Sequence, residues 1–398
     1  IQCNQCAYVC PHATIRPFAL TEEEAKNAPA NAKIVDIKAG KGKGVYKYTM
    51  AISPLDCMGC GVCVGQCPVG ALTMVGQESE LPEQDVFNYC VSKVSDKKDM
   101  QDLTVKGSQF KQPMLEFSGS CAGCAETSYA RLVTQLFGDR MYISNATGCS
   151  SIWGGPGATS PYCTDKNGHG PAWCNSLFED NAEHGFGMYV GQEKIREDLM
   201  AKTEQLLAIE WAQPALKEAA QKWLDTKDDG NANAEATKEY VAALQANIAE
   251  HAAELKAKGE KFCDCDACKL ACDILDKKDY LSKKSVWIFG GDGWAYDIGF
   301  GGVDHVLAQN KNVNVFVFDT EVYSNTGGQA SKASNIGQVA QFAAAGKETK
   351  KKSLSEIAMS YGYIYVAQVA MGANPAQTIK AITEAEAYNG PSLIIGYS

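Results

Sequence analysis

The sequence has no apolar run long enough to cross a membrane, no secretory signal peptide and no excess of positive charge. Its 37 Lys and Arg residues stand against 47 Asp and Glu residues, a formal net charge of −10. Nucleic acid is therefore not an expected partner, whereas basic or metal-bearing ligands suit this charge. Without a membrane-length run, no membrane partner is expected, and the chain is predicted to be soluble.

An initiator methionine is also absent, because the sequence begins at Ile1. It stops at Ser398, directly after the apolar stretch 392–397. Both ends fall inside predicted structure, so we expect a piece of a longer protein. With 398 residues, 45% of them apolar, the chain has enough material for two or three domains with full cores.

Cysteine, by contrast, is abundant, with 17 residues. Their tight spacing and the prolines that follow favour metal clusters in a reducing cytosol over disulfides. Residues 57–68 hold the full C-x2-C-x2-C-x3-C-P run of bacterial two-cluster ferredoxins. Residues 3–11 hold the same run without its leading cysteine, which we expect immediately before Ile1. The chain is thus predicted to be cytoplasmic.

In such runs one loop supplies three thiolates to a cluster, and the cysteine before proline reaches the partner cluster. Zinc or structural thiols, the alternative, rarely need eight cysteines in two copies. Two [4Fe-4S] clusters are predicted, one on Cys3, Cys6, Cys67 and the expected preceding cysteine, the other on Cys10, Cys57, Cys60 and Cys63. We assign residues 1–107 to this ferredoxin-like domain, with a solvated loop at 39–44 and a polar linker from residue 78.

A third group of cysteines stands beside predicted element boundaries. Cys121 and Cys124 precede a helical pattern at 129–137, and Cys149 follows a predicted strand at 141–145. These thiolates are three candidate ligands of a cluster whose fourth ligand lies elsewhere. A pair of buried thiols at a helix start is an equally good interpretation of the local sequence.

The stretch 285–329 carries the strongest cofactor signal outside the cysteines. A predicted strand at 285–289 ends in Gly290-Gly291-Asp292-Gly293-Trp294, and a second strand at 313–318 runs into a polar loop at 319–328. Ligands of such βαβ units bind at the carboxyl ends of the strands. Asp292 and the polar loop offer the oxygen ligands that Mg²⁺ prefers, and the glycines allow close approach to phosphate. A Gly-Asp-Gly alone more often marks an ordinary turn; the second loop is what favours a metal-bound diphosphate site.

Alternating strand and helix patterns over 108–398 predict an α/β domain with a parallel sheet. We expect a long loop at 154–187 and a helical insertion at about 193–281, broken into two long arms at 228–231. Helices are predicted at 338–346 and 355–361 and from Asn374-Pro375, and strands at 364–369 and 392–397. Within the insertion, a C-x-C-x2-C-x3-C run is open to zinc, another cluster or no metal. Its members are Cys263, Cys265, Cys268 and Cys272.

Together these motifs resemble the carboxyl-terminal portion of the single-chain pyruvate:ferredoxin (flavodoxin) oxidoreductases. The resemblance rests on the double ferredoxin run, on 120–126 (SCAGCAE), on 291–299 (GDGWAYDIG) and on 320–329 (TEVYSNTGGQ). It implies a ferredoxin domain followed by a thiamine-diphosphate domain.

The resemblance also implies roles for individual residues. Asp292, the Thr320 side chain and the Val322 carbonyl would hold Mg²⁺, and Asn325 would face the reacting carbon. Thiamine enzymes in general commonly have Asn at the position of Thr320, although this family shows Thr. Cys121, Cys124 and Cys149 would hold a third [4Fe-4S] cluster, with a fourth ligand just beyond Ser398. Cofactor contacts would come from Glu126, Cys149, Gly291, Asp292, Gly293, Trp294, Thr320, Glu321, Val322, Tyr323, Ser324 and Asn325.

The implied reaction is the oxidative decarboxylation of pyruvate with coenzyme A in an anaerobic, homodimeric enzyme that passes electrons to ferredoxin or flavodoxin. In this family the glutamate that activates thiamine belongs to amino-terminal domains, so we expect the chain alone to be inactive. Two alternatives stay open: an enzyme for another 2-oxoacid, and a two-cluster electron carrier with a vestigial thiamine domain.

Overall fold

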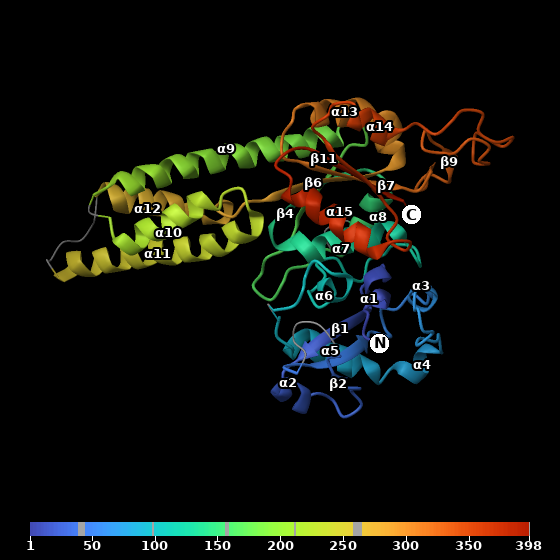
Figure 1. Cartoon of the computed structure of the whole chain (residues 1–398), viewed down its shortest axis with the longest axis horizontal. Coiled ribbons are helices and arrows are strands. Elements are labelled where there is room, and N and C mark those ends of the chain that lie inside the picture. The colour runs from blue at the N-terminus through green and yellow to red at the C-terminus, as the bar shows by residue number, and fades with distance from the viewer. Residues whose placement is uncertain (39–43, 98, 156–158, 211, 258–264, 398) are drawn as a thin grey trace. The chain divides into compact units, whose positions relative to one another are not determined.

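The structure, a computed structural model, describes residues 1–38, 44–97, 99–155, 159–210, 212–257 and 265–397. The loop predicted at 39–44 lies almost wholly outside the described residues. The chain forms two compact units, one made of residues 1–184 and 287–398 and the other of residues 185–286 (Figure 1). Among the described residues, no helix is long and apolar enough to cross a membrane.

The amino-terminal part of the first unit is a small α+β arrangement, as the cysteine runs predict. Its antiparallel sheet has the order β1-β3-β2, with Ile15 paired with Ile52. The elements are α1 (Gln5–Val9), β1 (Ile15–Leu20), α2 (Glu22–Lys26), β2 (Val35–Asp36), β3 (Lys47–Ile52), α3 (Val62–Gly65), α4 (Gln77–Glu80), α5 (Glu83–Lys93) and α6 (Val105–Ser108).

The segment predicted as a linker is partly helical. Val86 and Cys90 of α5, with Val94 just beyond it, pack in one buried cluster with Leu20 and Ala51 of the antiparallel sheet. These three positions recur every four residues, which is the period of a buried helix face and the signal that the polar composition concealed. The linker prediction is wrong for this helix, which completes the core of the ferredoxin-like part.

The rest of the first unit is built on a six-stranded sheet, β10-β11-β7-β6-β4-β5, whose parallel pairing confirms the predicted α/β class. From β4 the chain passes to β5 on one side and then to β6 on the other. The winding reverses between β4 and β6, and doubly wound sheets bind ligands at the carboxyl ends beside such a point. Its elements are α7 (Ala125–Phe137), η1 (Gly138–Arg140), β4 (Met141–Ala146), α8 (Cys149–Gly154), β5 (Ala172–Ser176), β6 (Ser285–Gly291), η4 (Gly293–Ile298), α13 (Phe300–Ala308), β7 (Asn314–Asp319), β8 (Val322–Tyr323), β9 (Gln329–Ala330), α14 (Leu354–Met359), β10 (Tyr365–Val369), α15 (Pro375–Ala387) and β11 (Ser392–Tyr397).

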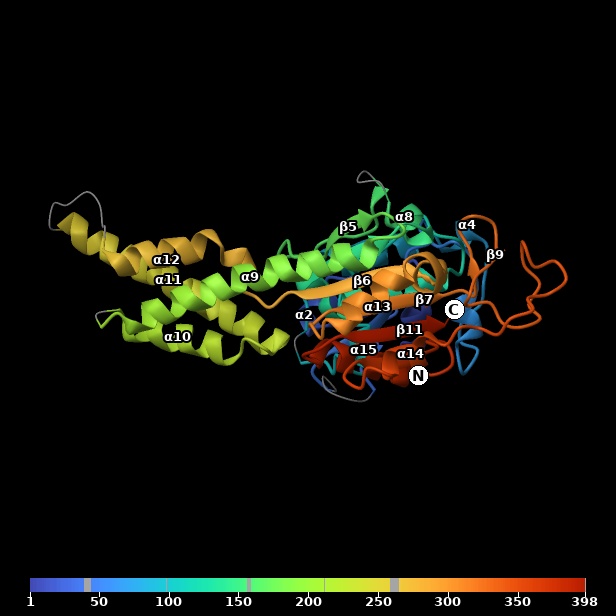
Figure 2. The same ribbon diagram turned by 90° about the horizontal axis from the view of Figure 1, so that it is seen from above.

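Helices cover both faces of this sheet. Trp287, Phe289, Phe316 and Phe318 alternate along β6 and β7 and pack in one core with residues of α7 and α15. In Figure 1, α13 and α14 lie on the opposite side of the sheet from α7 and α15, and Figure 2 shows β6, β7 and β11 side by side. β7 is buried throughout, as expected of a parallel strand between two helical layers.

The ferredoxin-like part and the parallel sheet share one core. The Arg131 guanidinium of α7 donates to the Tyr8 carbonyl, and Ser128 Oγ donates to the Val9 carbonyl at 3.0 Å. Tyr8 and Val9 belong to the same buried cluster as Phe316. The cysteine-bearing helix α1 is therefore fixed against the domain that carries the candidate cofactor site.

The helix predicted at 338–346 is wrong, whereas α14, β10, α15 and β11 confirm the remaining predictions for this half. Residues 338–346 form turns and isolated bridges instead. Ile336, Val339 and Phe342 are exposed, so no buried face supports a helix. Phe342 also has a φ of 64°, which no right-handed helix contains. The loop predicted at 154–187 holds the edge strand β5 and the first turns of α9.

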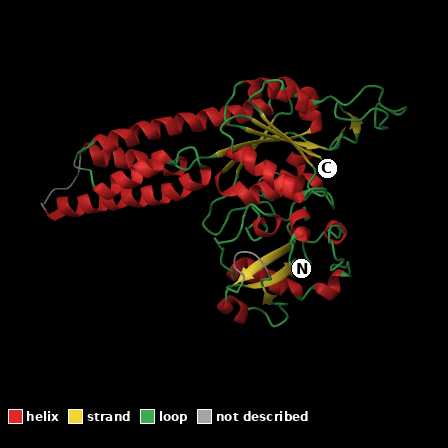
Figure 3. Cartoon of the chain, in the orientation of Figure 1, coloured by secondary structure: helices red, strands yellow, loops and turns green. Residues whose placement is uncertain are grey.

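The second unit is helical (Figure 3). A break before Pro214 separates α9 from α10, the predicted break at 228–231 separates α10 from α11, and α12 follows, so the described residues form four helices where two arms were expected. Trp223 fills its core, with Nε1 donating to the Leu281 carbonyl at 3.1 Å and Arg196 lying 5.6 Å from the ring centre. The elements are α9 (Asn181–Ala208), which begins in the first unit, α10 (Pro214–Asp225), α11 (Gly230–Ala257), α12 (Asp266–Asp276) and η3 (Lys278–Tyr280).

Candidate functional site

A cavity of about 210 Å³ lies at the carboxyl ends of β4, β6 and β7, where the winding of the sheet reverses. Segments that follow all three strands contribute to its wall. Eleven of the twelve residues predicted to contact a cofactor line it, namely Glu126, Cys149, Gly291, Asp292, Gly293, Trp294, Thr320, Val322, Tyr323, Ser324 and Asn325. The structure thus brings the residues together; their contacts with a cofactor stay predictions.

Five further lining residues were not among the predicted cofactor contacts: Thr147, Gly148, Ser150, Phe178 and Thr326. Four of them adjoin predicted residues or motifs along the chain, so a wider window would have included them. Phe178 has no such signal. It comes from the turn between β5 and α9, and its ring centre lies 6.2 Å from that of Tyr323.

Glu321 is the predicted contact that does not line the cavity. Its φ of 63° is in the left-handed region, and its carboxylate accepts from Asn335 Nδ2 at 2.7 Å and lies 3.3 Å from Lys351 Nζ. Asp319, at the end of β7, pairs with Lys351 at 2.8 Å and accepts from the Tyr296 hydroxyl at 3.0 Å. Both acids of this loop are therefore engaged by other side chains of the chain.

Oxygen atoms gather around the Thr320 hydroxyl at the cavity wall. Thr320 Oγ1 lies 3.0 Å from Asp292 Oδ1, 3.1 Å from the Val322 carbonyl oxygen and 2.7 Å from Ser324 Oγ. The second Asp292 oxygen accepts from Ser331 Oγ at 2.6 Å. One carboxylate, a hydroxyl and a backbone carbonyl on one spot are the donors that a hard cation such as Mg²⁺ takes, with phosphate oxygens and water completing an octahedron.

Two buried carboxyl groups face this cavity. Burial raises the pKa of Asp292 to about 6, against hydrogen bonds from Ser331 and Thr320 that lower it. Burial also raises the pKa of Glu126 to about 7, although Trp153 Nε1 donates to it at 2.9 Å. Burial without a counter-charge disfavours carboxylates, and a divalent cation beside Asp292 would reverse that effect.

The glycines of the Gly-Gly-Asp-Gly turn differ in the space around their Cα atoms. A Cβ on Gly290 would stand 2.3 Å from the Trp294 ring, and one on Gly293 would stand 2.5 Å from the Tyr323 ring. Both glycines therefore permit an aromatic ring to close over the backbone. A Cβ on Gly291 would meet nothing within 4 Å, so the space at that residue is open for a ligand.

Cys149 connects the cavity to the third group of cysteines. It is the first residue of α8 after β4, Cys124 caps α7, and the Cys124 N–H donates to the Cys121 carbonyl at 3.1 Å. The pKa of Cys149 is raised to about 12, by burial first and then by the negative charges of Glu126, Cys124 and Cys121. The charges of Cys121 and Cys124 therefore act on Cys149, and a cluster shared by the three thiols stays a prediction.

Cysteines of the two ferredoxin runs influence one another's pKa, and their assignment to clusters stays a prediction. The pKa of Cys63 is raised to about 11, by burial first and then by the charges of Cys10, Cys60 and Cys57. These four are the predicted second ligand set. For the first set, burial and the charge of Cys3 raise the pKa of Cys6, while Cys67 Sγ accepts from the Ala71 N–H at 3.2 Å. The pairing of Cys67 with Cys3 and Cys6 stays a prediction.

The two cysteine regions meet at Gly123. A Cβ built on this residue, which stands between Cys121 and Cys124, would lie 3.7 Å from the Cys60 Cβ. The second ferredoxin set therefore lies directly beside the third group of cysteines. Cys149 lines the cavity, and Cys60 lies beside Gly123 of the third group of cysteines.

Known proteins share this combination of parts. Residues 267–395 match the model of the thiamine pyrophosphate enzyme C-terminal TPP binding domain, and residues 1–71 match a 4Fe-4S dicluster domain. The chain is 52% identical over its whole length to the pyruvate:ferredoxin oxidoreductase of Moorella thermoacetica, covering 33% of that protein. It is 51% identical to the pyruvate-flavodoxin oxidoreductase of Klebsiella pneumoniae, covering 32% of it.

The chain is similar to the carboxyl-terminal portion of these oxidoreductases. That finding confirms the resemblance drawn from the motifs, together with the thiamine-diphosphate and iron–sulfur domains. The chain spans about a third of the length of these relatives. A mitochondrial pyruvate dehydrogenase [NADP(+)] of Euglena gracilis is also 47% identical over the whole chain, which covers 21% of it.

Proposed function

We propose that this chain is the cofactor-bearing, electron-conducting part of an enzyme that oxidatively decarboxylates pyruvate. In the proposed reaction, pyruvate and coenzyme A give acetyl-CoA and CO₂, and two electrons leave through three [4Fe-4S] clusters to ferredoxin or flavodoxin. One observation carries the proposal. A single cavity is lined on one side by the oxygen donors of Asp292, Thr320 and Val322 and on the other by Cys149 of the third thiol group.

When bound, thiamine diphosphate supplies a nucleophilic carbon and an electron sink for decarboxylation of a 2-oxoacid. The chain's own residues anchor and orient it. Asp292, Thr320 Oγ1 and the Val322 carbonyl would hold Mg²⁺ on the diphosphate, and the open backbone at Gly291 admits the phosphate oxygens. Asn325, on the exposed part of the same lining, would contact the reacting carbon and the substrate.

The thiol groups offer a path for the electrons. Cys149 lines the cavity, so with Cys121 and Cys124 it would hold the cluster nearest the thiamine cofactor. Because Cys60 lies beside Gly123, Cys57, Cys60, Cys63 and Cys10 would hold the cluster next to it, and Cys3, Cys6 and Cys67 would hold the third. The fourth ligand of the cluster on Cys121, Cys124 and Cys149 would come from beyond β11. Tyr397 of this strand pairs with Asp319 at this edge of the sheet.

The final acceptor and the setting are further parts of the proposal. The NADP⁺-named relative of similar identity indicates that this portion serves enzymes with different acceptors. The described cysteines are all free thiols, which suits a reducing cytoplasm and anaerobic metabolism. A homodimer rests on the resemblance alone.

A chimera tests the proposal. This chain would replace the matching portion of the Moorella thermoacetica enzyme, with anaerobic reduction of ferredoxin measured against pyruvate, 2-oxoglutarate and a branched 2-oxoacid. We expect activity that depends on pyruvate and coenzyme A, that is lost in the Asp292→Ala chimera, and that is absent from the isolated chain.

The contradictory result is a chimera with full iron content and bound thiamine diphosphate that reduces nothing with pyruvate. Faster reduction of ferredoxin with another 2-oxoacid would mean that this acid, and not pyruvate, is the substrate. Activity that survives Asp292→Ala would show that Asp292 is not needed to hold the cation, and a chimera that binds no thiamine diphosphate would favour the vestigial thiamine domain.

A further inference from the structure

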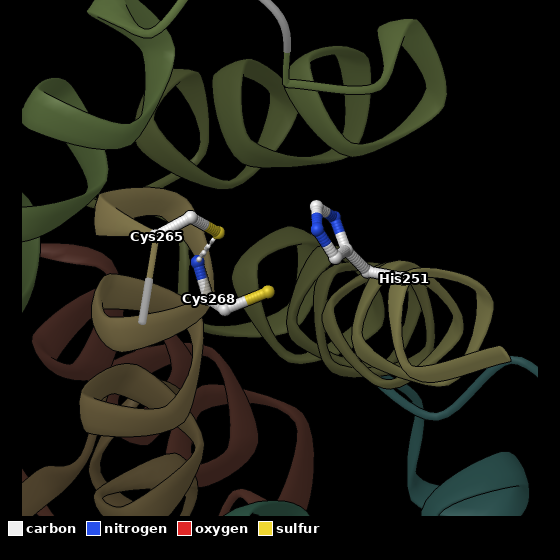
Figure 4. A group of neighbouring side chains, drawn as sticks. All are labelled: His251, Cys265 and Cys268. Atoms are coloured by element: carbon white, nitrogen blue, oxygen red, sulfur yellow. Dashed lines mark hydrogen bonds between the residues drawn. The ribbon is translucent and has the colours of Figure 1, made fainter. Parts of the chain in front are cut away.

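A further candidate metal site lies in the helical unit, far in sequence from the ferredoxin cysteine runs. His251, Cys265 and Cys268 have their ligand atoms within 4.8 Å of one another (Figure 4). His251 belongs to α11, Cys265 caps α12, and Cys268 lies in its first turn. Among the residues that the structure describes, this is the one group of three such side chains that meets so closely.

Helix packing brings the histidine there. Buried Ala236, Tyr240, Leu244 and Asn247 recur every three or four residues along α11 and face the core of the unit. His251 is the next position of that stripe, so its ring points toward α12, where an apolar residue would continue the pattern. Figure 4 shows the imidazole and both sulfur atoms directed into one space between the helices.

The cysteines approach from the start of α12. Ala267, Cys268, Ala271 and Ile274 form the buried face of this helix, and Cys268 is 6% exposed. The Cys268 N–H donates to Cys265 Sγ at 3.4 Å, a contact that holds both sulfur atoms on the same side of the helix start. A structural thiol would fill a gap in the core, but that role gives no reason for a second thiol and an imidazole at the same point.

We propose that His251, Cys265 and Cys268 bind a borderline-soft divalent cation, Zn²⁺ first among them. Two thiolates and a neutral imidazole are the ligand types that Zn²⁺ takes in tetrahedral sites, with water or another donor in the fourth position. Binding displaces the two thiol protons to solvent and involves no change of oxidation state. The resulting complex has no net charge, which suits its partly buried position.

The cation would tie the end of α11 to the start of α12. Residues 258–264, which include Cys263 of the predicted C-x-C-x2-C-x3-C run, lie outside the described residues. The closing of this connection by a metal would stabilise the helical unit independently of any ligand in the cavity of the first unit.

The test is zinc analysis of the anaerobically purified 398-residue chain, with iron measured in the same samples. We expect about one zinc per chain, with an X-ray absorption spectrum showing two sulfur neighbours at about 2.3 Å and nitrogen at about 2.0–2.1 Å. Cys265→Ser and His251→Gln should lose the zinc and keep the iron, whereas His251→Cys should keep both.

Matched controls are Cys174→Ser and His305→Gln, which change an exposed cysteine and an exposed histidine of the first unit and should retain zinc. Cys265 and His251 are only partly buried, so these variants should fold, as circular dichroism would verify. Wild-type protein without zinc, zinc that survives both ligand variants, or a Cys265–Cys268 disulfide in protein whose thiols were trapped at lysis would overturn the proposal.

Discussion

The cavity at the strand ends and the group of His251, Cys265 and Cys268 collect donor atoms in opposite ways. At the cavity, the chain leaves β6 and β7 and offers a carboxylate, a hydroxyl and the Val322 carbonyl, which accepts from the Thr320 hydroxyl. In the helical unit, backbone carbonyls inside the helices are occupied by helical hydrogen bonds, and the three candidate ligands are side chains. The first arrangement yields hard oxygen donors and the second yields nitrogen and sulfur. The local fold therefore favours a different class of cation at each place.

The largest expected effect comes from giving the cavity a soft donor. Asp292→Cys should weaken Mg²⁺-dependent binding of thiamine diphosphate at least about 100-fold, because a thiol is a poor ligand for Mg²⁺. Cd²⁺, a softer ion, should restore part of the binding. Anaerobic calorimetry measures both.

The control for this exchange is Asp304→Asn on α13, whose carboxylate accepts from the Tyr361 hydroxyl at 2.9 Å away from the cavity lining. It should leave binding unchanged. Equal binding of Mg²⁺ by Asp292→Cys would mean that the cation sits elsewhere, and the contrast between the two sites would fail.

The ligand residues of the cavity could be predicted from the sequence more completely than those of the site in the helical unit. Asp292 and Thr320 directly follow the apolar strands that carry them, and the carboxyl ends of neighbouring parallel strands meet at one edge. His251 meets Cys265 only because α11 packs on α12, across 14 positions whose path no local pattern specifies. The spacing of the cysteines is therefore visible in the sequence, whereas the place of the histidine is not. Phe178 was not predicted either, because it reaches the cavity from the turn between β5 and α9, which no local pattern assigns to the site.

A smaller effect is expected from Gly293→Ala. The added Cβ would stand 2.5 Å from the Tyr323 ring, so the ring or the turn must move. We expect a loss of about 1–3 kcal/mol in the free energy of unfolding of the first unit, together with weaker cofactor binding. Chemical denaturation followed by tryptophan fluorescence measures the stability.

Gly301→Ala is the matched control, because a Cβ at this exposed position of α13 would meet nothing within 4 Å. It should be neutral or stabilise the unit by about 0.5–1 kcal/mol, as glycine is unfavourable inside a helix. Equal destabilisation by Gly293→Ala and Gly301→Ala would show that contact with the Tyr323 ring is not what requires glycine at position 293. Neither change should alter the zinc content of the helical unit.

The smallest effect concerns pH. Burial raises the pKa of Asp292 to about 6, and the hydrogen bond from Ser331 opposes that rise. Ser331→Ala should raise the pKa further, so cation binding, which needs the carboxylate, should fail at a higher pH. We expect roughly threefold to tenfold weaker binding at pH 6 and near-equal binding at pH 8.

Ser360→Ala removes a hydroxyl that donates to the Ile357 carbonyl at an exposed site, and its binding curve should follow the wild type at every pH. A Ser331→Ala deficit that is the same at pH 6 and pH 8 would assign Ser331 to packing and would disprove its effect on the ionisation of Asp292.

The oxygen donors at the strand ends are proposed to hold a divalent cation on a diphosphate. Mn²⁺ can replace Mg²⁺ as a paramagnetic probe in the anaerobic chain, and electron–nuclear double resonance then detects nearby phosphorus. We predict ³¹P coupling to the bound Mn²⁺ when thiamine diphosphate is added, and its loss in Asp292→Ala. Bound Mn²⁺ without ³¹P coupling, or coupling that survives the substitution, would contradict the account.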